Sequence, residues 1–307
     1  MLQIEQKKVN NKPFFYLSEQ IPLGNKYKKI QVYLGKNIPN NFELFYKKLQ
    51  TKETKLVIDN IKKIFVTEKN IPLEQITEIE KLKIKWKYLI LSLSSFQQEQ
   101  LWRKIAIQFI YESNAIEGSK LSPTEVEAII RKKYLNKNID RKEIIEVENS
   151  IKAFALIRNP KFELNQRTII KLHSIVTNEL KVTKGYKKVK IIVNNKETTP
   201  PGQVRPQMSQ LLNFWHKQKK LNRHPLFIAA NFHQQFESIH PFEDGNGRVG
   251  RLLFNWMLLR LSYPPILFRF QNRLTYFSAL NQADDGRPKK WYWHCLRVYK
   301  NTLKNLV

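Results

Sequence analysis

Residues 240–251 read HPFEDGNGRVGR. A histidine, two adjacent carboxylates, three glycines and two arginines fall within these twelve positions, and neither a helix nor a strand needs such a mixture. The segment before it, PLFIAANFHQQFESI, has helical periodicity, and the segment after it, RVGRLLFNWMLL, predicts a second helix. The stretch is therefore predicted to be a charged glycine loop that joins two helices.

Gly245 to Gly250 also follow the order G-x-G-x-x-G, which is typical of dinucleotide-binding loops. Such a loop follows a strand, and an acidic residue comes about twenty positions later. Here a helix is predicted before the loop, and no acidic residue occurs between Asp244 and Asp284. A G-x-x-x-x-G-K-[ST] sequence is also absent. The context therefore excludes a Rossmann-type dinucleotide site and a P-loop NTPase.

The loop is predicted to bind an anion. The first amide groups of the second helix have no partner within that helix and point back over the loop, where Gly245 and Gly247 carry no side chain. The helix dipole favours negative charge at the same place. Arg248 and Arg251 are three positions apart, so both are expected to project toward one region, where they would match a pyrophosphate.

Two further groups suit a transfer reaction at that anion. Asp244 is placed to hold Mg²⁺ against phosphate oxygens, and His240 to accept a proton from an attacking hydroxyl. Together they indicate phosphoryl or nucleotidyl transfer. The alternatives are a plain helix–helix turn with surface charge, and a metal site of His233, His240 and Asp244. We interpret His233 as a buried core histidine and Phe242 as a core side chain that fixes the loop.

The composition favours a soluble, intracellular protein with an anionic partner. The 307 residues include 54 basic and 26 acidic ones, a net charge of +28, although a lysine-rich solvated surface would give the same excess. Residues 1–100 contain eighteen Lys, ten acidic residues and no Arg, so the anion site is expected further along the chain. Cys295 is the only cysteine, and the most apolar stretch, 252–268, is broken by Arg260 and two prolines. A cytoplasmic location without membrane contact is expected.

The chain before the motif is predicted to be mainly helical after a short β segment. A small β-hairpin is expected over 13–35, where aromatic and β-branched residues flank a turn. Helices are expected over 40–112, with a break near Asn70–Pro72. The stretch KLKIKWKYLILSL (81–93) alternates like a strand, but its helical flanks favour a helix.

Local signals mark further element ends. Gly118 looks like a helix stop, and Ser122 with Glu125 like a capping box that starts the next helix. A second strand pair is expected over 185–202, turning at Asn194–Asn195. Further helices are expected near 140–157, 165–180, 206–220, 225–239, 247–262, 272–283 and 288–304.

The loop motif resembles that of the Fic family, HxFx[DE]GNGRxxR. Every fixed position matches, namely His240, Phe242, Asp244, Gly245, Asn246, Gly247, Arg248 and Arg251. The resemblance extends from about residue 105 to the C-terminus, so we expect a Fic domain over 101–307 after an N-terminal module over 1–100. It implies a mainly α fold, a Fic-type helical bundle with a β-hairpin flap.

Fic enzymes typically transfer AMP from ATP to a Ser, Thr or Tyr hydroxyl of a protein and release pyrophosphate. The resemblance therefore implies a nucleotidyltransferase that AMPylates a target protein or itself, with ATP as substrate and Mg²⁺ as cofactor. It makes His240 the general base and Asp244 the Mg²⁺ ligand. The residues it assigns to the phosphates are Gly245, Asn246, Gly247, Arg248 and Arg251.

Two other segments extend the resemblance. Segment 186–201, which includes Thr199 and Pro200, resembles the family's flap, a hairpin that docks the target chain by strand pairing. After the glycine-x-aromatic pattern that precedes the flap, the family often has Arg, and this chain has Lys187. Thr199 and Pro200 belong to the TTPP stretch that also matches the family pattern.

The segment RLTYFSAL (273–280) resembles the adenine side of the family's nucleotide site. Tyr276 matches an aromatic position there, Phe277 replaces a frequent second Tyr, and Asp284 stands where some relatives have Asn. The resemblance therefore implies a nucleotide contact at Tyr276.

A second motif implies regulation. Fic proteins with an inhibitory helix carry [ST]-x-x-x-E-[GN], and this chain has SNAIEG at 113–118, in a helix expected near 105–118. The resemblance makes Glu117 an inhibitory carboxylate and Ser113 its partner. A carboxylate on Arg251 would occupy the fork that the γ-phosphate needs, so ATP would bind only in an unproductive pose. The combined reading is an autoinhibited adenylyltransferase.

Two rival functions stay open. Related Fic-fold enzymes transfer UMP, phosphate or phosphocholine, and some remove AMP. The charge of +28 also allows a nucleic-acid-binding regulator, although residues 1–100 contain no Arg and no zinc-finger, RNP or helix-turn-helix pattern. Self-modification and a homodimer are left open as well. The target is not readable from the sequence, because a flap pairs through its backbone.

Overall fold

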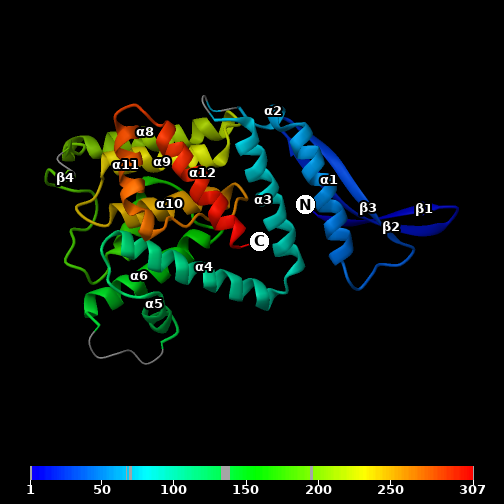
Figure 1. Cartoon of the computed structure of the whole chain (residues 1–307), viewed down its shortest axis with the longest axis horizontal. Coiled ribbons are helices and arrows are strands. Elements are labelled where there is room, and N and C mark those ends of the chain that lie inside the picture. Colours follow the sequence, from blue (N-terminus) through cyan, green and yellow to red (C-terminus); the bar gives the residue numbers. More distant parts are fainter. Residues whose placement is uncertain (1, 67, 69–70, 133–138, 194–195, 307) are drawn as a thin grey trace. The chain divides into compact units, whose positions relative to one another are not determined.

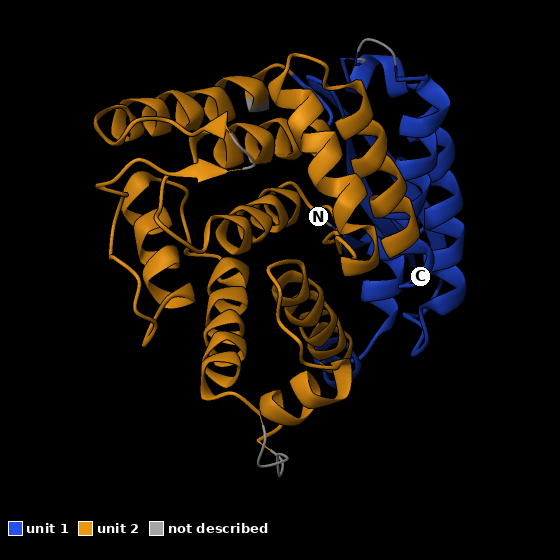
Figure 2. Cartoon of the chain, turned by 60° about the vertical axis from the view of Figure 1, so that its left-hand side comes forward, with its two compact units in different colours: residues 1–99, 222–224, 303–307 blue, residues 100–221, 225–302 orange. Residues whose placement is uncertain are grey.

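The computed structural model describes residues 2–66, 68, 71–132, 139–193 and 196–306. They form two compact units, coloured separately in Figure 2. The first comprises residues 1–99, 222–224 and 303–307, and the second comprises residues 100–221 and 225–302. The fold is mainly α, as the sequence predicts. None of the helices in the described ranges is long and apolar enough to span a bilayer.

The first unit begins with an antiparallel sheet whose strands follow the order β1 (Gln3–Val9), β2 (Lys12–Leu23) and β3 (Lys26–Gly35) (Figure 1). The β2–β3 pair confirms the predicted hairpin, and Gly24 turns it with a positive φ of 68°. Strand β1 is absent from the sequence-based prediction. Six of its seven residues are exposed, so QIEQKKV carries no apolar alternation to mark it.

Two helices of this unit cover one face of the sheet. They are α1 (Glu43–Asp59) and α3 (Leu73–Ser92), with the single turn α2 (Ile61–Ile64) between them. The stretch 81–93 is thus helical up to Ser92, as expected, and Asn70 of the expected break lies outside the described residues. Alternate residues of β2 and β3 form the core with the two helices. Its buried members are Leu17, Ile21, Ile30, Val32, Leu34, Leu49, Val57, Ile84 and Tyr88.

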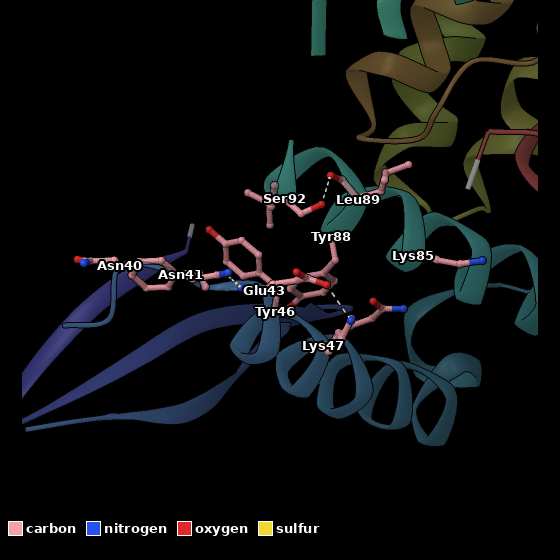
Figure 3. Close-up of a pocket in the computed structure, with 12 residues that line it drawn as sticks. Asn40, Asn41, Glu43, Tyr46, Lys47, Lys85, Tyr88, Leu89 and Ser92 are labelled. Atoms are coloured by element: carbon pink, nitrogen blue, oxygen red, sulfur yellow. Dashed lines mark hydrogen bonds and ion pairs between the residues drawn. The ribbon is translucent and has the colours of Figure 1, made fainter. Parts of the chain in front are cut away.

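A cavity of about 680 Å³ lies within the first unit, between the start of α1 and the end of α3 (Figure 3). Its aromatic wall consists of Phe42, Tyr46 and Tyr88, and Lys47 pairs with Glu43 at its rim at 2.8 Å. No histidine and no residue of the 240–251 motif lines it. Nothing in this lining corresponds to the predicted transfer chemistry.

The second unit contains all or most of each remaining element. These are α4 (Ser95–Ile116), α5 (Pro123–Ile130), α6 (Arg141–Arg158), α7 (Gln166–Val176), β4 (Ile192–Val193), β5 (Lys196–Glu197), α8 (Pro201–Lys220), α9 (Pro225–Ile239), α10 (Asn246–Arg260), η1 (Phe270–Asn272), α11 (Arg273–Asp284) and α12 (Lys289–Lys304) (Figure 1). Helix α10 is buried over nearly its whole length and packs against α6, α7 and α9. The motif loop between α9 and α10 is therefore held at the centre of this helical bundle.

The local end signals are confirmed. Gly118 follows the end of α4 with a φ of 106°, and its amide donates to Ala115. Ser122 and Glu125 form both bonds of the capping box at α5. The expected strand pair over 185–202 was too long, because only two residues pair on each side of the flap, and Asn194–Asn195 lie outside the described residues.

Candidate active site

The motif loop is closed by its own side chains. Helix α9 ends at Ile239, and His240 takes a positive φ of 49°, which turns the chain into the loop. The Asn246 side chain donates to the Phe242 carbonyl and accepts from the Phe242 amide, both at 2.9 Å. His173 of α7 stacks on the buried Phe242 ring, with 3.8 Å between ring centroids. Asn246 thus shapes the loop through its side chain, and Phe242 is the core residue that the sequence predicts.

Two glycines of the loop are required by different constraints. Gly245 precedes α10 in the left-handed region, with a φ of 80°. Gly247 lies against the ends of two side chains. An added Cβ would lie 2.2 Å from Oε1 of Glu117 and 2.9 Å from Nη1 of Arg251, so these ends would have to move. The backbone at the start of α10 therefore lies directly against the Glu117–Arg251 pair.

Arg251 is buried and is held by the last two turns of α4. Its Nη2 donates to Oε1 of Glu117 at 2.7 Å and to the Ser113 carbonyl at 2.9 Å, and its Nε donates to the Ser113 hydroxyl at 3.0 Å. Only 1 % of the Arg251 side chain is exposed, against 37 % of Glu117. Burial is the largest single influence and lowers the pKa of Arg251, but Glu117, Tyr276 and Glu237 together raise it, and the net pKa lies above its usual value. The contact that an inhibitory Glu117 requires is present.

Arg248 has different partners. Its Nη1 donates to Oε1 of Glu146 on α6 at 3.0 Å, and its Nη2 lies 3.4 Å from Oδ2 of Asp244. The expectation that both motif arginines reach one region is therefore wrong for this structure. The reason is that carboxylates from two different places, Glu117 just after the end of α4 and Glu146 on α6, draw the guanidinium groups apart.

His240 is half-buried and electrically neutral at neutral pH. Burial lowers the pKa of its imidazole to about 4, and the nearby ammonium of Lys187 lowers it further. The backbone carbonyl of Glu237 and the carboxylates of Glu117 and Asp244 act in the opposite direction. A neutral imidazole has a free lone pair, so His240 is able to accept a proton.

A single cavity of about 860 Å³ brings part of the predicted site together. Its lining includes Glu117, His240, Gly247, Arg251 and Tyr276, and both flap strands contribute to its wall. The other predicted site residues do not line it, namely Ser113, Thr199, Pro200, Asp244, Gly245, Asn246 and Arg248. Asn246 and Ser113 are buried behind the wall, and Asp244 has an exposed side chain at the edge of the loop.

The adenine side differs from the expectation. Tyr276 is almost fully buried, and its hydroxyl is bonded to Nε2 of His233 at 2.6 Å. His233 is the core histidine that the sequence predicts, and burial lowers its pKa to about 3. Leu274 and Phe277 on α11 are the side chains with exposed apolar surface in this wall. Tyr276 thus contributes the surface of its ring to the cavity, while its hydroxyl is bonded to His233.

Sequence reasoning missed three residues that shape the site. Burial raises the pKa of the Glu237 carboxyl to about 8, so this cavity-lining group is neutral at pH 7. Glu146 fixes Arg248 from a helix about a hundred residues away. Lys187 is buried beside His240. Only Lys187 carried a sequence signal, as a lysine where the family often has Arg.

The donor set fits a magnesium ion shared with a substrate. No cluster of three or more His, Cys, Asp or Glu side chains occurs within the described ranges, so a cage made of protein ligands alone is not found there. The Asp244 carboxylate is 57 % exposed, and its oxygens contact only the Gly245 amide and Arg248. Mg²⁺ commonly uses one or two carboxylates and takes its other ligands from water and substrate phosphates.

Comparison of the sequence with known proteins points to the family that the motif resembles. The family model for the Fic/DOC family matches residues 163–258. The protein adenylyltransferase Fic of Nematostella vectensis is 29 % identical over 215 residues, which cover 68 % of this chain and 50 % of that protein. The chain thus contains a Fic/DOC domain within residues 163–258. The protein adenylyltransferase Fic of Drosophila grimshawi is 26 % identical over 253 residues, covering 81 % of this chain and 49 % of that protein.

Solved Fic structures share the fold. A Fic domain containing signalling protein from Bacteroides thetaiotaomicron superposes with a TM-score of 0.68 at 22 % identity, covering 75 % of this chain and 95 % of that one. Fic-1 of C. elegans superposes with a TM-score of 0.69 at 20 % identity, covering 87 % and 77 %. The chain spans about half the length, or less, of the curated Fic relatives it matches.

Proposed function

We propose that this Fic protein is an autoinhibited protein adenylyltransferase that transfers AMP from ATP to a protein hydroxyl. One observation carries the proposal. His240, the Gly247 backbone and Arg251 face one cavity of about 860 Å³, and the Glu117 carboxylate lies on Arg251 within it. A base, an anion cradle and a carboxylate on the anion's arginine are the parts that a restrained nucleotidyl transfer needs.

The transfer step assigns His240 the base role. The target hydroxyl oxygen forms a bond to the α-phosphorus of ATP, and the bond from that phosphorus to the bridging oxygen of the β-phosphate breaks. Pyrophosphate leaves with the electron pair, and the hydroxyl proton passes to the neutral imidazole of His240. The lowered pKa of about 4 keeps this imidazole unprotonated at neutral pH, ready to accept the proton.

The phosphates are assigned to the start of α10. The first turn of α10, which begins at Asn246, supplies backbone amide groups that have no partner within the helix and the positive end of the helix dipole. Arg251 supplies a buried fork for the distal phosphate once Glu117 leaves it. Asp244 would hold Mg²⁺, which neutralises phosphate charge when bound. The apolar wall of Leu274 and Phe277 would receive the adenine base.

The flap is assigned to the target chain. Strands β4 and β5 pair with each other over only two residues, and Val189, Ile192 and Val193 are exposed. A short exposed hairpin with free edge groups can add a strand from a partner. Thr199 donates to Gln207 at 2.9 Å, and Pro200 precedes α8, so these two residues anchor the flap's base.

Inhibition follows from the geometry of α4. Its end is anchored by Glu112, which accepts from Arg269 at 2.9 Å and from the Phe270 amide at 2.6 Å. Ser150 adds a bond to Asn114 at 3.2 Å. These contacts hold Glu117 on Arg251, so a γ-phosphate and the Glu117 carboxylate compete for one guanidinium.

The test follows label from ATP. Wild type, Glu117→Gly and Glu117→Gln are incubated with α-labelled ATP and Mg²⁺. His240→Ala is the blank, and Glu127→Gln, at a partly exposed carboxylate of α5 that pairs with Arg131, is the matched control. We expect protein-bound label on both Glu117 variants, little on wild type and Glu127→Gln, and none on His240→Ala. Label from γ-labelled but not α-labelled ATP would make the protein a phosphotransferase.

One observation favours a second activity. Glu117 lines the same cavity as His240 and has a partly exposed carboxylate, so it could orient a water against a bound AMP ester. If no label transfers in any variant, while pre-adenylylated protein loses AMP only when Glu117 is present, AMP removal is the main activity and the transfer proposal is wrong.

A further inference from the structure

Lys187 is buried between the flap and the motif loop. Only 2 % of the residue is exposed, and it lies five positions before the start of β4. Its backbone amide donates to the carbonyl of Pro241 at 2.9 Å. The segment that leads into the flap is therefore fixed to the residue that follows His240.

The Lys187 ammonium extends this connection. Its Nζ donates to the Thr198 hydroxyl at 2.5 Å and to the Ile239 carbonyl at 3.3 Å. Thr198 in turn donates through its hydroxyl, at 2.8 Å, and its amide, at 3.1 Å, to the Ile191 carbonyl across the flap. One ammonium thus links the two sides of the flap to the carbonyl at the end of α9, one residue before the proposed base.

Burying an ammonium group without a carboxylate partner costs free energy of folding, so the buried position of Lys187 calls for a compensating role. Burial is the cause of the lowered pKa of Lys187, at about 8, and no carboxylate opposes it. The two acceptors offset part of the cost, because the Ile239 carbonyl carries the negative end of the α9 dipole. A shorter or apolar side chain would avoid the cost but would leave Thr198 and Ile239 unconnected.

We infer that Lys187 is a positioning residue that sets the spacing between the flap and His240. The target hydroxyl would arrive on the flap, and the proton acceptor lies at the end of α9, so the ammonium that joins the two fixes the distance over which the proton moves. This inference rests on the proposed transfer function. It assigns Lys187 no contact with ATP, since the residue does not line the 860 Å³ cavity.

The test compares Lys187→Met, Lys187→Arg and Thr198→Val, each combined with Glu117→Gly. The matched control is Lys184→Met, which removes an exposed charge three residues earlier, outside the flap. We measure the rate of self-labelling with saturating α-labelled ATP, the affinity for ATP, and amide hydrogen exchange over residues 186–193 and 196–201. The thermal midpoint of each variant establishes that it is folded.

Loss of a buried charged hydrogen bond predicts a rate about tenfold or more lower in Lys187→Met, with ATP affinity within about twofold. Flap amides should exchange faster in the same variant. Lys187→Arg should keep the rate within about threefold, Thr198→Val should show a smaller loss, and Lys184→Met should match the parent. If Lys187→Met does not fold, Thr198→Val and Lys187→Arg decide.

The outcomes separate two failures. An unlabelled Glu117→Gly parent would count against the proposed function, and the exchange measurement would still decide whether Lys187 holds the flap. A labelled parent with equal labelling and equal flap exchange in Lys187→Met and Thr198→Val would overturn the positioning role. A loss that appears only in ATP affinity would also overturn it, because it would make Lys187 part of the nucleotide site.

Discussion

One ion pair of the first unit and two of the second have similar lengths but differ in solvent exposure. In the first unit, Lys47 and Glu43 pair at 2.8 Å with side chains that are 69 % and 62 % exposed. In the second unit, Arg251 and Glu117 pair at 2.7 Å with the guanidinium 1 % exposed, and Arg248 and Glu146 pair with 6 % and 15 % exposed. Similar distances therefore describe a solvated pair in one region and desolvated pairs in the other.

The difference in exposure determines how much each ion pair affects the stability of the folded chain. Solvated pairs gain little, since water screens them and flexible side chains lose freedom when they pair. Desolvated pairs are costly to form and more costly to break. The second unit keeps two such pairs at Arg248 and Arg251, three residues apart on α10. The expected effects of substitution should follow this order, from the buried motif to the exposed helix.

The largest effect is expected at Arg251. Replacing it by Met leaves Glu117 and Ser113 without their partner, and the folded state should lose about 3 kcal/mol, the lower end for a buried pair because Glu117 can rehydrate. Label transfer should also vanish in the Glu117→Gly background. Urea denaturation and the labelling assay measure the two effects. A variant as stable as wild type would mean that the pair contributes nothing to folding.

The second effect is a pH dependence at Glu237. Its pKa is about 8 in the folded state against 4.5 for an ordinary Glu carboxyl, so the unfolded chain loses its proton at lower pH. Stability from this group is complete below pH 4.5 and is lost as the pH rises toward 8. Glu237→Gln should remove this slope and gain about 2 kcal/mol relative to wild type at pH 8. Thermal midpoints from pH 5 to 8 measure it, and parallel curves would contradict it.

The third effect is expected at a half-buried charge cluster of the first unit. Lys87 pairs with Glu19 at 2.6 Å and with Glu53 at 2.7 Å, and both carboxylates are largely buried. Lys87→Met should cost about 1–2 kcal/mol, because the carboxylates lose their shared cation. Lys81→Met, at an exposed position of the same helix, is the control. Equal midpoints for the two variants would make this cluster as weak as a surface pair.

The smallest effect is expected at Glu43. Glu43→Gln breaks the exposed pair with Lys47, and water replaces the lost partner on both sides. No resolvable change in the urea midpoint is expected, with wild type measured in parallel. A clear loss of stability would show that exposure alone does not identify the ion pairs that contribute nothing to folding. The contrast between the units would then need another explanation.

The sequence predicted those features that depend only on neighbouring residues in the chain. The loop between α9 and α10, the stop at Gly118 and the capping box at Ser122 each depend on residues within a few positions of one another. The motif at 240–251 also predicted the Fic resemblance, and the second motif at 113–118 predicted the contact between Glu117 and Arg251. Burial periodicity located most helices, although α8 begins five residues before the expected start, because Pro201 occupies the first turn, where proline is tolerated.

Only the tertiary structure decided how the side chains are partnered. Glu146 lies 102 positions before Arg248, and Lys187 meets Ile239 from 52 positions away. Such contacts depend on how helices pack, and the side chains involved carry no local signature. The same holds for the neutral Glu237 and for the Tyr276 hydroxyl, because burial fixes the pKa and the bonds of each. The sequence by itself thus determined the motif loop, and packing decided which of its charges are paired and buried.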